Sequence, residues 1–95
     1  MTEKKWTFVT NHAVVLTLLD REENLTSREI AIVLEITERT VIRIIKDLEA
    51  AGYITKRREG RQNRYTLNKS LPLRRTDQRE VNVHELIELL ARLEI

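Results

Sequence analysis

Cysteine is absent from this sequence of 95 residues, which excludes disulfides, thiolate metal sites and cysteine nucleophiles. Glycine occurs twice and proline once, so long segments can be helical without interruption. No apolar run approaches the roughly 18 residues that a membrane span requires, and the polar first ten residues do not form a secretory signal peptide. We therefore expect an intracellular, soluble protein.

Histidine, like glycine, occurs only twice. His12 and His84 fall in separate predicted helices, and no carboxylates cluster beside either one. The sequence also lacks a glycine-rich phosphate loop and any grouping of His, Cys and Asp with metal-ligand spacing. We therefore expect no enzymatic activity, no metal and no other cofactor, and we expect both histidines to be structural or surface residues.

Charged residues, by contrast, are abundant and unevenly distributed. They make up 34% of the chain, although the formal net charge is only +2. Residues 39–79 carry twelve Lys or Arg against four Asp or Glu, a balance of +8, whereas residues 80–95 carry four Glu and one Arg. This asymmetry predicts a polyanion-binding central region and a C-terminal segment with another task. Ordinary solvated surface charge is the alternative that composition alone leaves open.

Apolar residues recur at intervals of three and four in the first half of the chain, which is the spacing of one helix face. The first such segment predicts a helix at residues 11–20, with Thr10 or Asn11 as its N-cap. The longest begins after the capping residue Thr37 and ends before Gly52, where a left-handed backbone costs least. The residues predicted to form its buried side are Val41, Ile44, Ile45 and Leu48.

A shorter helix is predicted between these two. It begins at Thr26 or Ser27, and Glu29 is placed to complete a capping box. Its predicted apolar face consists of Ile30, Ala31, Val33 and Leu34. Because the next capping signal, Thr37, follows Ser27 by only ten residues, the two helices are joined by a tight turn and form a helix-turn-helix.

After the third helix the apolar residues alternate with a period of two, which is typical of strands. Residues 53–58 and 62–67 are predicted to be strands, and the turn at residues 59–61 makes them a β-hairpin. The arginine-rich tip should point to solvent. The side chains expected to face the helices are Ile54, Tyr65 and Leu67.

The last segment, residues 83–95, is predicted to be an amphipathic helix that follows a connector at residues 70–82. Its apolar stripe has more large residues than one helix can hide on a small domain, and Trp6 and Phe8 have no obvious place in the core either. We therefore predict a two-fold dimer interface at both termini, although a helix folded back on its own domain is the alternative. The predicted interface residues are Trp6, Phe8, Val83, Leu86, Ile87, Leu89, Leu90 and Leu93.

The order of these elements predicts a mostly α (α+β) fold, a winged helix-turn-helix with a two-stranded wing and a C-terminal dimerisation helix. Residues 1–69 would form the DNA-binding domain, in which residues 1–10 are an arm. In this arrangement the third helix enters the major groove and the hairpin, or wing, reaches the DNA backbone or minor groove.

Residues 36–54, from the start of the third helix to the first strand, resemble the junction between recognition helix and wing in MarR-like and ArsR-like regulators. Together with residues 6–13 and 58–65, this likeness covers nearly the whole chain and is closest to small MarR-like regulators. The resemblance implies a transcriptional regulator that binds DNA, but the junction motif is not specific for any target gene.

A helix wheel predicts which side chains of the third helix face the groove. Arg39 and Arg43 share a side, and an arginine there can pair with guanine O6 and N7. Thr40 can bond a phosphate or a base. Ile42 can meet a thymine methyl, or it packs on the first helix or on a neighbouring molecule. Lys46 lies on or beside the same face.

Phosphate contacts are expected from two further places. At the start of the second helix, Ser27 and Arg28 lie at a positive helix end, although Ser27 can equally be a plain cap. The wing would neutralise several phosphates, which would make binding fall steeply with salt. The wing residues predicted to bind DNA are Arg57, Arg58, Arg61, Asn63 and Arg64.

Taken together, these features predict a homodimeric, sequence-specific regulator of transcription that binds double-stranded DNA in the cytoplasm, at the nucleoid. A winged helix used as a protein-interaction module is the main alternative, because fold does not fix function. RNA binding is weaker still, since no aromatic platform is present. A small-molecule effector is not indicated, because the connector and the single terminal helix leave little room for a pocket.

Overall fold

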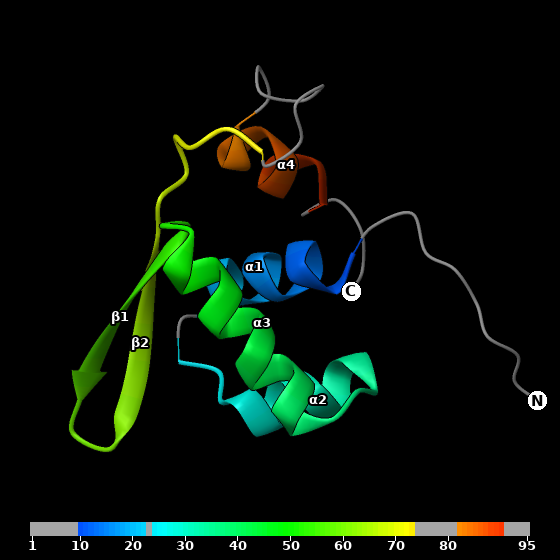
Figure 1. Ribbon diagram of the computed structural model, residues 1–95, viewed down its shortest axis with the longest axis vertical. Helices are drawn as coiled ribbons and strands as arrows, with labels where there is room; N and C mark the ends of the chain where they lie inside the picture. Colours follow the sequence, from blue (N-terminus) through cyan, green and yellow to red (C-terminus); the bar gives the residue numbers. More distant parts are fainter. Residues whose placement is uncertain (1–9, 23, 74–81, 91–95) are drawn as a thin grey trace, which may run out of the picture.

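Six elements follow one another in the predicted order in the computed structural model, which describes residues 10–22, 24–73 and 82–90 (Figure 1). They are α1 (Asn11–Arg21), α2 (Ser27–Leu34), α3 (Glu38–Ala50), β1 (Ile54–Glu59), β2 (Gln62–Leu67) and α4 (Val83–Leu90). This arrangement of helices and a two-stranded antiparallel sheet confirms the winged helix-turn-helix prediction.

Threonine side chains cap the N-termini of the first three helices. Thr10 accepts a bond from the amide of Ala13 at 3.3 Å, so the cap is Thr10 rather than Asn11. Thr26, rather than Ser27, caps α2 and forms the full capping box with Glu29, with distances of 3.0 and 2.9 Å. Each hydroxyl satisfies a backbone donor that has no partner inside the helix.

Both helices of the helix-turn-helix end on a left-handed residue. At the end of α3 this residue is Gly52, with φ +87°, and the amide of Tyr53 donates to the carbonyl of Leu48 at 2.9 Å. At the end of α2 the same position is held by Glu35, with φ 58°. The amide of Ile36 closes that turn on the carbonyl of Ala31 at 3.1 Å. These bonds stop each helix sharply and set the angle of the tight turn.

The first strand of the hairpin begins and ends one residue later than predicted, so Glu59 belongs to the strand and not to the turn. Tyr53 belongs to the cap of α3, so β1 begins at Ile54 and extends to Glu59, which pairs with Gln62. Gly60 provides the positive φ, +63°, that the two-residue loop requires. Ile54 and Tyr65 are buried as predicted, and Leu67 is half-buried.

The core lies where α1, α2, α3 and the root of the hairpin meet. α1 contributes most of it, and the hydroxyl of its buried Thr17 donates to the carbonyl of Ala13 at 2.9 Å. Val41, Ile44, Ile45 and Leu48 form the buried side of α3, as expected. In α2, Ile30 and Ala31 are buried, but the prediction for Val33 is wrong. Val33 is 48% exposed because α2 is short and packs on its neighbours through one narrow side.

The helix α4 packs against its own domain, beside α1 (Figure 1). Asn82 and Glu85 form a capping box at its start, with both bonds at 2.9 Å. The amide of Val83 donates to the carbonyl of Leu71 at 2.9 Å, and the Tyr53 hydroxyl donates to the carbonyl of Pro72 at 2.6 Å. The two ends of the connector are therefore hydrogen-bonded to each other, and Pro72 is also bonded to Tyr53 of the domain.

The position of α4 corrects part of the predicted dimer interface. Val83, Ile87 and Leu90 are at most 5% exposed, and the first two belong to the core cluster, so they are not free to meet a partner. The helix hides half of its apolar stripe by folding back, which was the alternative. Leu86 is half-buried and Leu89 is 60% exposed, while Trp6, Phe8 and Leu93 lie outside the described residues. No described helix has the length and apolar content needed to cross a membrane.

Candidate nucleic-acid interface

One side of α3 is charged and open to solvent. Arg39, Arg43 and Lys46 are exposed, and none of them forms an ion pair with the described residues. The opposite side of the helix is sealed against the core, because Val41 is 0% and Ile44 1% exposed. The tight turn and both helix caps fix this orientation, so the cations stay on the outside.

Two smaller side chains lie among these cations. Ile42 is 40% exposed, so it does not pack fully on the first helix. Thr40 is half-buried, its amide donates to Thr37 at 3.1 Å, and the two hydroxyls lie 2.8 Å apart. Thr40 therefore completes the cap of α3, and its hydroxyl is already hydrogen-bonded. Ile42 adds an apolar surface within a charged face, which is the property that contact with a methyl group requires.

The start of α2 carries the other predicted phosphate ligands. Ser27 is the first residue of this helix and is half-buried, while Arg28 is exposed and makes no ion pair with the described residues. Because the cap belongs to Thr26, the hydroxyl of Ser27 is not the capping group. The positive end of the α2 dipole and the Arg28 side chain together favour an anion at this position.

The wing projects from the end of α3 and descends beside it, so its tip lies at the same end of the molecule as α2 and the start of α3 (Figure 1). Arg61 is exposed in the loop and has no ion pair with the described residues. The Nε of Arg58 donates to the carbonyl of Gly60 at 3.2 Å. Asn63 pairs with Arg58 across the hairpin and is half-buried.

Arg57 and Arg64 face each other across the two strands and share one carboxylate. Glu59 Oε2 lies 2.9 Å from a terminal nitrogen of Arg57, and Glu59 Oε1 lies 2.8 Å from the Nε of Arg64. The arginines of the wing are therefore of two kinds, because Arg58 and Arg61 lie outside this group. The sequence analysis did not predict that Arg57 and Arg64 share Glu59, because this contact depends on the strand register.

Two other residues were not among the predicted contacts. Lys56 is exposed on β1 without an ion pair to the described residues, and its position directly before two arginines was a usable signal. His12 Nε2 lies 2.9 Å from Asp47 Oδ2 and so links the start of α1 to α3. This bond agrees with a structural role for His12. Within the described residues no cluster of His, Cys, Asp and Glu could hold a metal ion.

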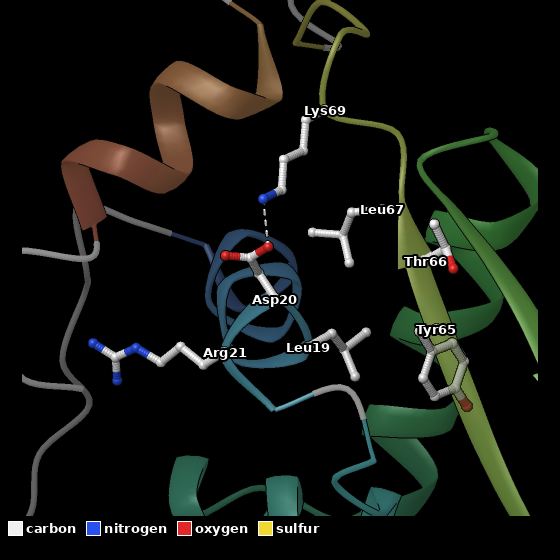
Figure 2. Close-up of a pocket in the computed structure, with 7 residues that line it drawn as sticks. All are labelled: Leu19, Asp20, Arg21, Tyr65, Thr66, Leu67 and Lys69. Carbon is white, nitrogen blue, oxygen red and sulfur yellow. Dashed lines mark ion pairs between the residues drawn. The ribbon is translucent and has the colours of Figure 1, made fainter.

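A hollow of about 420 Å³ lies between the end of α1 and β2 (Figure 2). Leu19, Tyr65 and Leu67 form its apolar wall, and the ion pair between Lys69 Nζ and Asp20 Oδ1, 2.7 Å long, lies at its polar side. Burial raises the pKa of the Tyr65 hydroxyl above its ordinary value of 10.0, more than Asn63 lowers it. Of the three charged residues that line the hollow, Asp20, Arg21 and Lys69, the first and the last form an ion pair with each other.

Comparison with known proteins agrees with this geometry. The sequence profile of the MarR family matches residues 10–64. No curated protein matches the chain significantly. Among solved structures, MepR of Staphylococcus aureus, a transcription regulator of the multidrug efflux pump MepA, is 21% identical with a TM-score of 0.57. The alignment covers 88% of this chain and 56% of MepR.

Two further structures show the same fold. MepR of Staphylococcus aureus in complex with DNA is 22% identical, with a TM-score of 0.53 and coverage of 90% of this chain and 66% of that one. PcaV of Streptomyces coelicolor, a transcriptional regulator in complex with its natural ligand, is 19% identical, with a TM-score of 0.53 and coverage of 90% and 63%. This chain thus spans between half and two thirds of the length of these proteins. Because the family profile matches more than half of a chain with a winged helix fold, this chain belongs to the MarR family.

Proposed function

We propose that this chain is a transcriptional regulator that binds double-stranded DNA through α3 and the wing. One observation carries the proposal: Arg39 and Arg43 are exposed on α3 without an ion pair to the described residues, and the start of α3 lies at the same end of the molecule as the wing tip (Figure 1). Members of the family are winged helix regulators, and one solved neighbour, MepR, has a structure in complex with DNA. We extend to this chain the non-enzymatic character of the family.

In this proposal α3 lies in the major groove. Arg39 and Arg43 are four residues apart, so both project from one side of the helix. A guanidinium can donate two parallel hydrogen bonds to guanine O6 and N7, and each such pair contributes about 1–3 kcal/mol of discrimination. Ile42 can contact a thymine methyl beside them, and Lys46 and Thr40 border this face.

Positioning on the duplex would come from phosphate contacts. Ser27 and Arg28 would meet one strand at the start of α2. The wing would reach the backbone or the neighbouring minor groove. The wing residues in this role are Arg57, Arg58, Arg61, Asn63 and Arg64. Contacts of this kind carry no sequence information, but they fix the register in which α3 meets the bases.

We further propose that the regulator acts as a homodimer in the cytoplasm, at the nucleoid. A two-fold dimer places two recognition helices about one DNA turn apart, on two halves of a palindromic site. Leu89, and in part Leu86, are the described apolar side chains available for such an interface. Trp6, Phe8 and Leu93, which complete the proposed interface, lie outside the described residues.

A protein-interaction module is the second candidate, and one observation favours it. Ile32 is 68% and Val33 48% exposed on α2, which leaves an apolar surface without a partner among the described residues. Such a surface is typical of protein contacts. DNA binding is the better-supported function, because an interaction module would not need cations on both α3 and the wing that lack ion pairs within the described part of the chain.

Selection of bound duplexes from a random DNA library, followed by footprinting, tests the proposal directly. We expect one enriched motif, protection over two half-sites, and affinity that falls with salt by several units on a log–log plot. Single-stranded RNA of matched length serves as the competitor. Failure to enrich any duplex, together with binding that does not depend on salt, would refute DNA binding and favour the interaction module.

A further inference from the structure

The wing contains one acidic side chain among its basic residues, and its position is specific. Glu59 accepts from both Nε and a terminal nitrogen of Arg57, at 3.0 and 2.9 Å through Oε2. Its other oxygen, Oε1, lies 2.8 Å from the Nε of Arg64. The two oxygens of a single carboxylate thus hold two guanidinium groups that belong to opposite strands.

Strand register explains why this carboxylate is needed. Arg57 and Arg64 are direct cross-strand partners, and like charges in that relation repel each other. Glu59 lies two residues beyond Arg57, so its side chain is on the same face of the hairpin. It therefore lies diagonally opposite Arg64, within reach of both cations. The net charge of the three side chains together is +1 instead of +2.

We infer that Glu59 is a positioning residue that limits how much of the wing's positive charge is offered to phosphates, an inference that rests on the proposed function. The carboxylate accepts a hydrogen bond from the Nε of Arg57 and forms an ion pair with Arg64. Arg61, which has no ion pair with the described residues, carries its full charge at the tip.

The consequence concerns the balance between specific and non-specific binding. Non-specific affinity comes almost entirely from phosphate neutralisation, whereas specific affinity also includes base contacts. A carboxylate that competes with phosphates therefore weakens non-specific binding more than binding to the correct site. Glu59 raises the ratio between the two at some cost in total affinity.

The test compares Glu59→Gln with Glu88→Gln, which removes the same charge from α4 at the opposite end of the molecule from the wing tip (Figure 1). We expect Glu59→Gln to bind random-sequence DNA more tightly, with a log–log salt slope steeper by about one to two, since each neutralised phosphate contributes roughly 0.9. Glu88→Gln should keep the slope of the unmodified protein. Equal slopes for all three proteins would overturn the inference.

A triple variant identifies the released cations. Adding Arg57→Ala and Arg64→Ala to Glu59→Gln should return the salt slope to that of the unmodified protein or below it. A slope that stays steep would show that other groups are responsible and would also overturn the inference.

A measurement without DNA separates the two proposals. In nitrogen-edited NMR spectra of the unmodified protein, the Nε–H signals of Arg57 and Arg64 should both move on Glu59→Gln, while that of Arg61 should not. Unmoved signals would contradict the shared carboxylate. If they move but the unmodified protein binds no DNA, the proposed function is what fails. If DNA binding holds with unchanged slopes, the inference about Glu59 fails alone.

Discussion

An arginine on α3 and an arginine on the wing have the same charge but different surroundings. Arg43 extends from a helix fixed by caps at both ends, whereas Arg61 lies in the hairpin loop. A rigid position permits directional contact with a base edge, and a loop position suits the less directional attraction to phosphates. The two residues should therefore respond differently to removal.

We expect Arg43→Ala to weaken binding to the selected site by about 1–3 kcal/mol and to relax base preference at one position. Arg61→Ala, which removes the same charge from the wing, should weaken binding to every sequence and lower the salt slope by about one. Titration of both variants against matched specific and random duplexes checks this. Equal specificity ratios for the two variants would contradict the assignment of α3 to the major groove.

Glu35 is the described non-glycine residue with a positive φ, 58°. A left-handed conformation costs roughly 1–2 kcal/mol for a residue with a Cβ, and glycine would remove this cost. Glycine also loses more conformational entropy on folding, which cancels part of the gain. Glu35→Gly should therefore stabilise the fold by about 0.5–1 kcal/mol. Lys46→Gly, in the exposed middle of α3, should instead destabilise it by a similar amount. Urea unfolding of both variants measures the change in the free energy of unfolding. A lower free energy of unfolding for Glu35→Gly than for the unmodified protein would refute the argument.

The raised pKa of the Tyr65 hydroxyl predicts how the stability of the fold changes at high pH. Burial raises the pKa of its hydroxyl above 10.0, so the neutral form is favoured in the folded chain. Below pH 10 this contribution is fully present, and it is lost as the pH rises from 10 through the raised value, because the unfolded chain ionises first. Tyr65→Phe should lose less stability over that interval. Thermal unfolding of Tyr65→Phe and of the unmodified protein between pH 9 and about 11 measures this difference. Parallel loss of stability in the two proteins would contradict the prediction.

At the scale of elements, the eight residues of α4 have two different sides. One side, with Val83 and Ile87, completes the core of its own domain, and the other side presents Leu89 to solvent. The periodicity that predicted the helix was correct, but it could not distinguish a face that meets its own domain from one that meets a second chain.

Two substitutions in α4 distinguish the role of its buried side from that of its exposed side. Ile87→Ala should destabilise the fold by about 2–5 kcal/mol, because it removes buried methyl groups from a packed core. Leu89→Ala should change the free energy of unfolding of the single chain by no more than about 0.5 kcal/mol but weaken self-association. Denaturant unfolding and sedimentation measure the two effects. Strong destabilisation by Leu89→Ala in a monomeric protein would contradict the proposed interface.

At the scale of the molecule, the wing tip and the helix-turn-helix lie at one end, and α4 lies at the other (Figure 1). This separation allows a partner to be bound at one end while DNA is bound at the opposite end. Sedimentation at micromolar concentration should therefore show a dimer, and footprints should have two-fold symmetry with half-sites about one DNA turn apart. A monomer that protects a single half-site would contradict the dimer.

Much of the fold could be predicted because its signals are local. Thr10, Thr26 and Thr37 mark the helix starts through bonds to residues three positions ahead, and Gly52 marks the end of α3 through its own backbone conformation. The exposed side of α3 followed from helical periodicity. Val33 was misassigned because periodicity indicates the apolar side of a helix but not the width of surface that its neighbours cover.

Local sequence signals were enough to predict the order of the elements and the exposed cations of α3, because capping, helical spacing and strand alternation depend on residues only a few positions apart. Tertiary structure alone decided which half of α4 is buried, and it decided that Glu59 is shared between Arg57 and Arg64. Both outcomes depend on contacts between segments that become neighbours only on folding. Their geometry is set by packing and strand register, which no local pattern encodes.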